Sequence, residues 1–574
     1  MSNEAVKIIF GLLGGLAIFI YGMNLMSEGL QKAAGEKMRS ILGILTKNPV
    51  IGVLAGALTT AVLQSSSATT VMAIGFVSAG LMTLKQAISV VLGANIGTTI
   101  TAQLIAFDIR EFIFPIIVVG FILYFFFKKE IIKNIGQTVF AFGLLFLGIS
   151  SMSAVMGPLA MTPFFPDLIM TVKNVPILGV LVGTGMTVII QSSSATIAVL
   201  QNLASQAGPD GASLLGLAGS LPILFGDNIG TTITAVFASI GTSVNAKRTA
   251  VAHIIFNLSG TIIFMILMPL FIRFVYFISP KGYELDVISR QIANAHTSFN
   301  LINTLIWLPF TWFLAKLVTK IIPDRKDNLI DENKPIYLDP KIINQPVFAI
   351  HMATKELSRV ATVAGSMITY AENALLHNSK EDISKLMKSE NSVDILQDHS
   401  VKYLASISQN AEITEHQSIR ISGLVRIAID IERIGDHCTN LAEFARSNYK
   451  LKSPFTEEAQ KELESMFEKV TKMVNDTVEA LDTGNPELAQ SILKQEDYLD
   501  LLEEHLRHTH MKRINKGICS PENTVLYTDV LQNMERIGDH CTNIAEAVLS
   551  DIHFNDGFNA DEGETEPTVL TTSN

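Results

Sequence analysis

Long uncharged runs of apolar residues fill the first 320 positions of the chain. Asp, Glu, Lys and Arg are all missing from the ranges 48–84, 86–107, 112–127, 134–166, 174–209, 249–272 and 291–315. A helix needs about 20 apolar residues to cross the hydrocarbon core of a bilayer. The runs therefore predict roughly eight to ten helices that span or half-span a membrane.

Two of these runs, 48–84 and 174–209, carry small and polar residues in their middle. Each is too long for one helix and too short for two full spans, and each contains Gly, Pro, Gln and Ser. At membrane depth, backbone can leave the helical conformation only where protein or a water-filled cavity shields it. We therefore predict re-entrant or broken helices in both runs.

Beyond residue 340 the pattern changes to helical periodicity throughout, with breaks near 376–380, 408–412, 450–456, 483–486 and 517–522. These breaks predict six long helices. Residues 321–340 hold three prolines among charged residues, which is typical of a linker. The acidic end of the chain, 551–574, is rich in Thr and Gly, and we expect it to be disordered. The whole pattern predicts an all-α chain with a membrane domain at 1–320 and a helical domain at 341–550.

Charge separates the two parts. Residues 1–320 hold 18 Lys and Arg and 11 Asp and Glu, whereas the rest of the chain holds 25 basic and 43 acidic residues. A soluble protein has about 25 % charged residues, so only the second part has a composition suited to water. Its acidic balance argues against nucleic acid as a partner.

Basic loops predict the orientation in the membrane. Positive charges concentrate in cytoplasmic loops, and the basic residues between the runs are Lys128, Lys129, Lys133, Lys247 and Arg248, followed by Lys316, Lys320, Arg325 and Lys326. The second part is then cytoplasmic. The first apolar run lacks a clean cleavage site and is preceded by Glu4, so it predicts a membrane helix rather than a signal peptide. The odd number of cysteines, Cys438, Cys519 and Cys541, argues against a disulfide framework.

The membrane part is internally repeated. The segment 64–70, Gln-Ser-Ser-Ser-Ala-Thr-Thr, returns almost unchanged at 191–197, and the segment 93–102, Gly-Ala-Asn-Ile-Gly-Thr-Thr-Ile-Thr-Ala, returns at 226–235. Polar, interrupted segments at matching places in two halves are the best pointer in a sequence to the site of a transporter. We predict two repeats, about 45–130 and 172–272, that share one site.

These residue types suit an oxyanion and a small cation. A helix that begins at membrane depth directs free N–H groups and a positive dipole end at an anion, and serine hydroxyls add donors. Amide, hydroxyl and backbone oxygens can replace water around a cation. The candidate residues are Gln64, Ser65, Ser66, Ser67, Asn95, Thr98, Thr99, Gln191, Ser192, Ser193, Ser194, Asp227, Asn228, Thr231 and Thr232.

A second interpretation is open for some of these residues. Small polar residues also allow close packing of membrane helices, although the doubled motifs favour a substrate site. Asp227 is either a cation ligand or a residue at a water-filled mouth. His253 and His296 lie in two copies of an Ala-His-x-x-Phe-Asn segment, and we expect them to be hydrogen-bond donors at helix interfaces.

The doubled Gln-Ser-Ser-Ser and Asn-Ile-Gly-Thr-Thr motifs resemble the type II sodium–phosphate cotransporter family in its bacterial form, over most of residues 1–320. The resemblance implies an inverted-repeat transporter that carries inorganic phosphate with sodium as coupling ion. It also implies that the candidate residues carry the substrate and sodium sites. Two features depart from the repeat symmetry: Asp227 stands where the first repeat has Ala94, and the first repeat lacks an Ala-His-x-x-Phe-Asn copy.

The second part contains a repeated acidic motif. Residues 432–443, Glu-Arg-Ile-Gly-Asp-His-Cys-Thr-Asn-Leu-Ala-Glu, recur at 535–546 with one change. An earlier Glu-x-x-x-Asp pair precedes each copy, and residues at i and i+4 share a helix face. Two such pairs on adjacent helices offer four carboxylates, a ligand set for metal, although one pair alone would indicate a solvated face. The predicted ligands are Glu390, Asp394, Glu432, Asp436, Glu496, Asp500, Glu535 and Asp539.

This part, about 341–550, resembles the PhoU family of phosphate-signalling regulators. The resemblance implies two three-helix bundles that bind multinuclear metal, with Fe, Zn, Mn or Mg as candidates. We expect His437 and His540, which follow the acidic motifs, to lie near the metal without binding it.

Taken together, the sequence predicts sodium-dependent symport of inorganic phosphate across a bacterial inner membrane, with a cytoplasmic regulatory domain. No Gly-x-x-x-x-Gly-Lys-Ser/Thr loop occurs, so we expect neither ATP-driven transport nor an enzyme. The expected partners are phosphate, sodium ions and the lipid bilayer, with a second copy of the chain or phosphate-signalling proteins as further candidates. Two alternatives stay open: a transporter of another oxyanion such as sulfate or arsenate, and a membrane phosphate sensor that does not transport.

Overall fold

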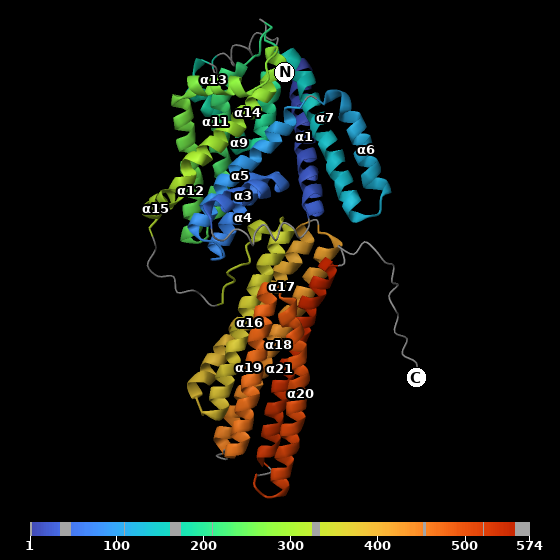
Figure 1. Cartoon of the computed structure of the whole chain (residues 1–574), viewed down its shortest axis with the longest axis vertical. Helices are drawn as coiled ribbons and strands as arrows, with labels where there is room; N and C mark the ends of the chain where they lie inside the picture. The colour runs from blue at the N-terminus through green and yellow to red at the C-terminus, as the bar shows by residue number, and fades with distance from the viewer. Residues whose placement is uncertain are drawn as a thin grey trace. The chain divides into compact units, whose positions relative to one another are not determined.

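The structure is a computed structural model that describes residues 3–34, 48–107, 109–160, 171, 174–208, 211–323, 333–411, 413–451, 455–519 and 522–556. It divides into two compact units, Met1–Asp327 and Asn328–Asn574. Both units are helical, and the only extended pairing among the described residues is an isolated bridge between Ala207 and Ser213 (Figure 1). The all-α prediction is confirmed. The last described helix, Glu522–Asp556, includes residues 551–556, for which disorder was predicted. The rest of that predicted disordered end, 557–574, lies outside the described ranges.

Helices of the first unit follow the uncharged runs. They are α1 Asn3–Ala34, α3 Pro49–Leu63, α4 Ser66–Ser78, α5 Leu84–Ile105, α6 Ile113–Phe126, α7 Glu130–Ala160, α9 Pro176–Ile190, α10 Ser193–Ala204, α11 Gly216–Ser239, α12 Val244–Ile266, α13 Met268–Ile278, α14 Glu284–Trp307 and α15 Thr311–Ile321. Within the described residues, six helical segments are long and apolar enough to cross a membrane, from Lys7–Ala33 to Glu284–Ile321. Shorter apolar helices, among them α3, α4 and α9, accompany them. These candidate spans and shorter apolar helices agree with the predicted mixture of spanning and half-spanning helices.

Both predicted helix breaks are present, and they fall on the repeated motif. Helix α3 ends at Leu63, Gln64 takes a left-handed φ of 50°, and α4 begins at Ser66. Helix α9 ends in the same way, with Gln191 at a φ of 57°. Ser65 and Ser192 cap the helices that follow, because each hydroxyl accepts a backbone N–H three residues ahead at 3.2 Å. The broken helices are therefore confirmed, whereas the inverted orientation of the repeats stays a prediction.

Glycines let α3 and α5 of the first repeat, and α9 and α11 of the second, touch backbone to backbone. A Cβ atom on Gly93 of α5 would lie 1.9 Å from the carbonyl oxygen of Val53 on α3. In the second repeat, a Cβ atom on Gly226 of α11 would lie 2.0 Å from the carbonyl oxygen of Val180 on α9. Only glycine fits such an approach. The two repeats thus share a packing geometry as well as a sequence motif.

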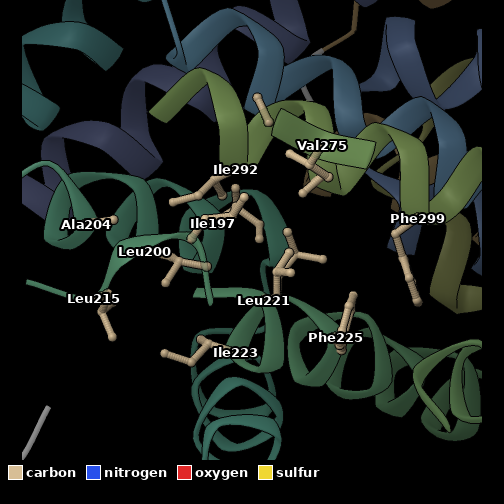
Figure 2. Packing of buried hydrophobic residues seen from close by; sticks show 14 of the residues in the cluster. Ile197, Leu200, Ala204, Leu215, Leu221, Ile223, Phe225, Val275, Ile292 and Phe299 are labelled. Carbon is tan, nitrogen blue, oxygen red and sulfur yellow. The ribbon is translucent and has the colours of Figure 1, made fainter. Parts of the chain in front are cut away.

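Each short helix that carries a Ser-Ser-Ser motif also packs against the other repeat. Ile74 of α4 lies in one apolar cluster with Ala235 and Ala238 of α11 and with Ala246 of α12. Helix α10 lies in a second cluster, which includes Ala102 of α5 together with residues of α11, α13 and α14. Figure 2 labels members of this cluster on α10, α11, α13 and α14 and at the residue just before α11, namely Ile197, Leu200, Ala204, Leu215, Leu221, Ile223, Phe225, Val275, Ile292 and Phe299. The two repeats are interlocked through these helices.

The second unit consists of six long helices whose ends match the predicted breaks. They are α16 Pro346–Leu376, α17 Lys380–Asn410, α18 Glu415–Leu451, α19 Glu457–Thr483, α20 Pro486–Asn515 and α21 Glu522–Asp556. Helix α16 packs on α17 and α18, and α19 packs on α20 and α21 (Figure 1). Contacts between α16 and α19 and between α18 and α21 join the two sets. The predicted pair of three-helix bundles is confirmed, and its cysteines are free thiols.

The end of the predicted linker belongs to the second unit. The carboxylate of Glu356 on α16 is completely buried and accepts the backbone N–H groups of Ile336 and Tyr337 at 2.8 and 2.7 Å. Arg359 pairs with the same carboxylate, and the Tyr403 hydroxyl donates to the carbonyl oxygen of Asp339. The prolines predicted a linker over residues 321–340, but the buried carboxylate of Glu356 on α16 holds the end of this segment in place.

Candidate functional site

A polar centre lies where the broken helix of each repeat meets the long helix of the other repeat, α4 with α11 and α10 with α5. Gln64 is buried, and its side-chain oxygen accepts a hydrogen bond from the Thr101 hydroxyl of α5 at 2.8 Å. Thr234 of α11 is the counterpart of Thr101 in the second repeat. Its hydroxyl donates to the Ser67 hydroxyl of the first repeat at 3.2 Å. The two repeated motifs are therefore in direct contact across the repeats.

A second set of hydrogen bonds joins the motif helix of the second repeat to the first repeat. Gln201 lies on α10 and is almost completely buried. Its amide donates to the carbonyl oxygen of Ala102 on α5 at 3.1 Å and to that of Ser289 on α14 at 2.9 Å. The motif helix of the second repeat is thus bonded to the long helix of the first.

The predicted Asn and Thr residues of both repeats are buried but bond within their own helices. The Asn95 and Asn228 amides each donate to the carbonyl oxygen four residues earlier, at 2.8 and 2.9 Å. Threonine hydroxyls also donate to carbonyl oxygens of their own helices, those of Thr98 and Thr231 four residues back and those of Thr99 and Thr232 three residues back. Each side-chain amide has two N–H groups, and that of Asn95 also lies 3.2 Å from Nε2 of His253 on α12. The amide and hydroxyl oxygens are the groups able to bind a cation.

The two glutamines of the repeated motif are not equivalent. Gln64 is buried and bonded to Thr101, whereas Gln191 is exposed. Within the described residues, no side-chain hydrogen bond of Gln191 is present, although Ser193 and Ser194 after it are buried. In the sequence the two glutamines occupy equivalent positions of the repeats. Their environments differ in the structure, where the one after α3 is buried and the one after α9 is exposed.

Asp227 is completely buried on α11. One carboxylate oxygen accepts the Thr187 hydroxyl at 2.6 Å, and the other has no partner in the described part of the chain. Thr187 also reaches the Thr196 hydroxyl at 3.1 Å, just as Thr60 reaches Thr69 at 2.8 Å in the first repeat. A buried carboxylate oxygen without a partner is costly. A cation or a proton beside it would remove that cost.

The second unit presents its eight predicted acidic ligands in two sets of four. The first set comprises Glu390, Asp394, Glu432 and Asp436 on α17 and α18, and the second comprises Glu496, Asp500, Glu535 and Asp539 on α20 and α21. Partial burial, followed by the negative charges of Asp394 and Asp436, raises the pKa of Glu390. Partial burial, followed by the charges of Asp500 and Asp539, likewise raises the pKa of Glu496. The carboxylates within each set are close enough to repel one another.

This proximity does not amount to a finished metal centre. Among the described residues, no group of three or more His, Cys, Asp or Glu side chains is placed to hold a metal ion. The nearby arginines instead bond to the acidic sets, with Arg433 reaching Asp436 and Arg536 reaching Asp539 at 3.1 Å each. Carboxylate oxygens are suitable ligands for a hard cation, but in this structure the carboxylates of each set are not arranged around one metal position.

The histidines of the acidic motifs join the two bundles. His437 Nδ1 lies 2.9 Å from the side-chain oxygen of Asn533, and His540 Nδ1 lies 2.8 Å from the carboxylate of Asp430. The two rings have centroids 5.5 Å apart. Burial lowers the pKa of His437. Nδ1 of each histidine is thus engaged at the contact of α18 with α21.

Comparison with known proteins identifies the first unit. The profile described as Na+/Pi-cotransporter matches residues 18–154 and 160–283, and these residues contain both copies of the repeated motifs. The chain belongs to the Na+/Pi-cotransporter family. A second profile, the PhoU domain, matches 357–445 and 463–548, one match in each three-helix bundle.

Relatives match either nearly the whole chain or a part of it. The Salmonella typhimurium protein named "Putative inorganic phosphate export protein YjbB" is 23 % identical over 94 % of this chain and 97 % of its own length. The Bacillus subtilis protein YqeW is 32 % identical, covering 54 % of this chain and 96 % of its own length. PhoU from Pseudomonas aeruginosa is 20 % identical over 35 % of this chain and 96 % of its own, with a TM-score of 0.33.

Sequence reasoning missed several residues at the centre of this cotransporter-family chain. Thr101 and Thr234 lie inside the repeated segments, so the repeat itself could have indicated them. Gln201 has no signal of this kind, because the matching position of the first repeat is Ile74. His253 was predicted to form a hydrogen bond at a helix interface, and its Nε2 on α12 does lie 3.2 Å from the side-chain nitrogen of Asn95 on α5, a residue of the candidate site.

Proposed function

We propose that this chain is a sodium-dependent symporter of inorganic phosphate in a bacterial inner membrane, with its PhoU-like unit in the cytoplasm. The observation that carries the proposal is the hydrogen bond between Thr234 and Ser67, because it joins the repeated motifs of the two halves. A site made jointly by two repeats can be opened to either side of the membrane by rocking one repeat against the other. The matching family is one of transporters, and the proposal includes no enzymatic step.

Phosphate would bind at the beginnings of α4 and α10. The first N–H groups of a helix have no partner within the helix and carry its positive dipole end. Buried hydroxyls lie at these positions, namely those of Ser66, Ser193 and Ser194, and Ser65, Ser67 and Ser192 adjoin them. The neutral donors of Gln64 and Gln191 complete the proposed anion site.

Sodium would bind to the oxygens beside this anion. The amides of Asn95 and Asn228 and the hydroxyls of Thr98, Thr99, Thr231 and Thr232 offer neutral oxygens, and Asp227 offers the one carboxylate in the proposed site. An anion held by neutral groups gains from a cation nearby, since opposite charges attract strongly in a medium of low dielectric constant. This gain is the physical basis for coupling the two ions.

The driving ion is tested with purified full-length protein in proteoliposomes. We expect uptake of radiolabelled phosphate that requires an inward sodium gradient and persists when the proton gradient is collapsed. The site is rich in neutral oxygens and has few buried carboxylates for a proton relay. Uptake that follows the proton gradient and ignores sodium would contradict the proposal.

The same vesicles decide direction and substrate. The relative YjbB is named as a phosphate export protein, so phosphate-loaded vesicles with an outward sodium gradient test transport in the opposite direction. Efflux without any sodium dependence would favour an exporter. Competition of arsenate and sulfate with phosphate for uptake tests the alternative that the protein transports another oxyanion. Phosphate binding without movement of phosphate in either direction would favour the membrane sensor.

For the second unit we propose that the two acidic sets take up divalent or ferric ions, with Fe, Zn, Mn and Mg as candidates. Partial burial, followed by repulsion from the neighbouring carboxylates, raises the pKa of Glu390 and Glu496. A cation between the carboxylates would relieve this repulsion, which is the motive for the proposal. If binding of metal or of a phosphate-signalling protein changed the structure of this unit, the unit would have a regulatory role. A second copy of the chain is another candidate partner.

Metal content is the measurement for this unit. The full-length protein with both Asp436→Asn and Asp539→Asn is expected to lose most of its bound metal, as determined by elemental analysis of the purified protein. Asp398→Asn is the matched control, because Asp398 lies on α17 and pairs with Lys402 outside the acidic sets. Equal metal in the double variant, the control and the wild type would refute the assignment.

A further inference from the structure

Two histidines lie close together where the bundles of the second unit meet. His437 on α18 and His540 on α21 occupy matching positions of the repeated acidic motif, and their ring centroids lie 5.5 Å apart. Both histidines are partly exposed, whereas the next residues, Cys438 and Cys541, are completely buried. The two imidazoles, unlike the two thiols, are open to a ligand from solution.

Hydrogen bonds fix which nitrogen of each ring carries the proton. An ionised carboxylate only accepts hydrogen bonds, so His540 Nδ1, 2.8 Å from the Asp430 carboxylate, carries the hydrogen. The Asn533 amide nitrogen donates to the carbonyl oxygen of Asp529, which leaves its oxygen to accept from His437 Nδ1 at 2.9 Å. In the neutral rings each Nε2 then keeps a lone pair. Within the described residues neither Nε2 has a hydrogen-bond partner.

The helix geometry turns both Nε2 atoms toward the space between the rings. The contacts pair Asp430 with His540 and Asn533 with His437, so α18 and α21 run antiparallel here. Side chains of a helix lean toward its N-terminus, so the two histidines lean toward each other while Asp430 and Asn533 lean away from them. Each Nδ1 is thus bonded on the outer side of the pair. Because the two nitrogens of an imidazole point to roughly opposite sides of the ring, each Nε2 points inward.

The geometry points to a metal site separate from the acidic sets, held by Nε2 of His437 and Nε2 of His540, for a divalent ion that prefers nitrogen ligands, such as Zn²⁺ or Cu²⁺. Imidazole suits these ions, whereas carboxylates suit harder ones. With a metal–nitrogen distance of about 2 Å and a tetrahedral angle, two imidazoles on one ion have ring centres about 5 Å apart. The observed 5.5 Å is close to this separation.

The hydrogen bonds of Nδ1 support this assignment. A histidine that binds a metal almost always donates its other ring N–H to a carboxylate or another oxygen, which fixes the orientation of the ring. Here both acceptors are also held from the other side, because Asn543 donates to Asp430 and Asn440 donates to Asn533, at 3.0 Å each. One ligand comes from each bundle, so a bound ion would tie the two bundles together, with water in its remaining positions.

Cu²⁺ added to tag-free full-length protein tests the site, because electron paramagnetic resonance distinguishes nitrogen ligands from carboxylate oxygens. We expect one equivalent of Cu²⁺ bound through two imidazole nitrogens. His437→Gln with His540→Gln should remove this signal, whereas His399→Gln, at an exposed position of α17, should leave it unchanged. Asp430→Asn removes the carboxylate behind His540 and is expected to weaken Cu²⁺ binding about tenfold to a hundredfold.

A purely structural role for the two histidines predicts a different result. Their hydrogen bonds would then only join α18 to α21, and the double histidine variant would be less stable yet keep the wild-type Cu²⁺ spectrum. That outcome, or a wild-type spectrum without two imidazole nitrogens, overturns the inference. If the double variant does not fold, an unchanged Cu²⁺ affinity of Asp430→Asn overturns it equally.

The variant with both Asp436→Asn and Asp539→Asn separates this site from the acidic sets. It is expected to keep Cu²⁺ bound through two imidazole nitrogens even where it loses metal from the carboxylates. Loss of the imidazole signal in this variant would show that the histidines have no metal site of their own.

Discussion

Gly183→Ala is expected to prevent most of the protein from folding, whereas Gly185→Ala, two residues along the same helix, is expected to leave folding intact. A Cβ atom on Gly183 would lie 2.0 Å from the carbonyl oxygen of Ile223 on α11, and backbone cannot move away cheaply. A Cβ atom on Gly185 meets nothing within 4 Å. Alanine stabilises a helix relative to glycine by about 1 kcal/mol, so Gly185→Ala is not expected to destabilise the protein.

The measurement is the yield of monodisperse protein in detergent and its thermal unfolding temperature. Gly56→Ala extends the test to the first repeat, because a Cβ atom there would lie 2.1 Å from the carbonyl oxygen of Val90. We expect it to behave like Gly183→Ala. Equal stability of Gly183→Ala and Gly185→Ala would show that the helices of a repeat can separate without cost, and the close backbone contact would then be irrelevant to assembly.

Asp227→Asn is expected to raise the sodium concentration for half-maximal phosphate uptake at least tenfold. The substitution keeps the shape and can keep the hydrogen bond from Thr187, but it removes the charge from a fully buried position. A buried negative charge contributes strongly to the binding of a cation, because the dielectric constant around it is low. A loss of about 1.4 kcal/mol in binding free energy corresponds to a tenfold weaker affinity. The measurement is a sodium titration of uptake at fixed phosphate.

Asp286→Asn provides the control for Asp227→Asn, because it makes the same chemical change at an exposed position in the first turn of α14. The sodium dependence of this control should match that of the wild type. If Asp227→Asn also matches the wild type, Asp227 does not bind the coupling sodium. A shift in the pH dependence of uptake at unchanged sodium dependence would assign Asp227 to a proton instead.

Local patterns were sufficient for the helices and their breaks. The uncharged runs predicted the apolar helices of the first unit, because membrane spans need length and apolarity, which composition shows directly. The breaks at Gln64 and Gln191 were visible as polar residues inside apolar runs. The six helices of the second unit ended where turn residues interrupt the helical period. The pairs of acids at i and i+4 share helix faces for the same local reason.

The sequence by itself therefore determined which residues form helices, where these helices break, and which motifs recur. Tertiary structure alone decided which of the recurring residues meet. It brought Thr234 to Ser67, buried Gln64 but exposed Gln191, and placed His540 beside Asp430. It also attached residues 336–339 to Glu356 and Tyr403. Helix formation depends on neighbours within a few positions, whereas these contacts join residues far apart in the chain and depend on how whole helices pack, which no local period encodes.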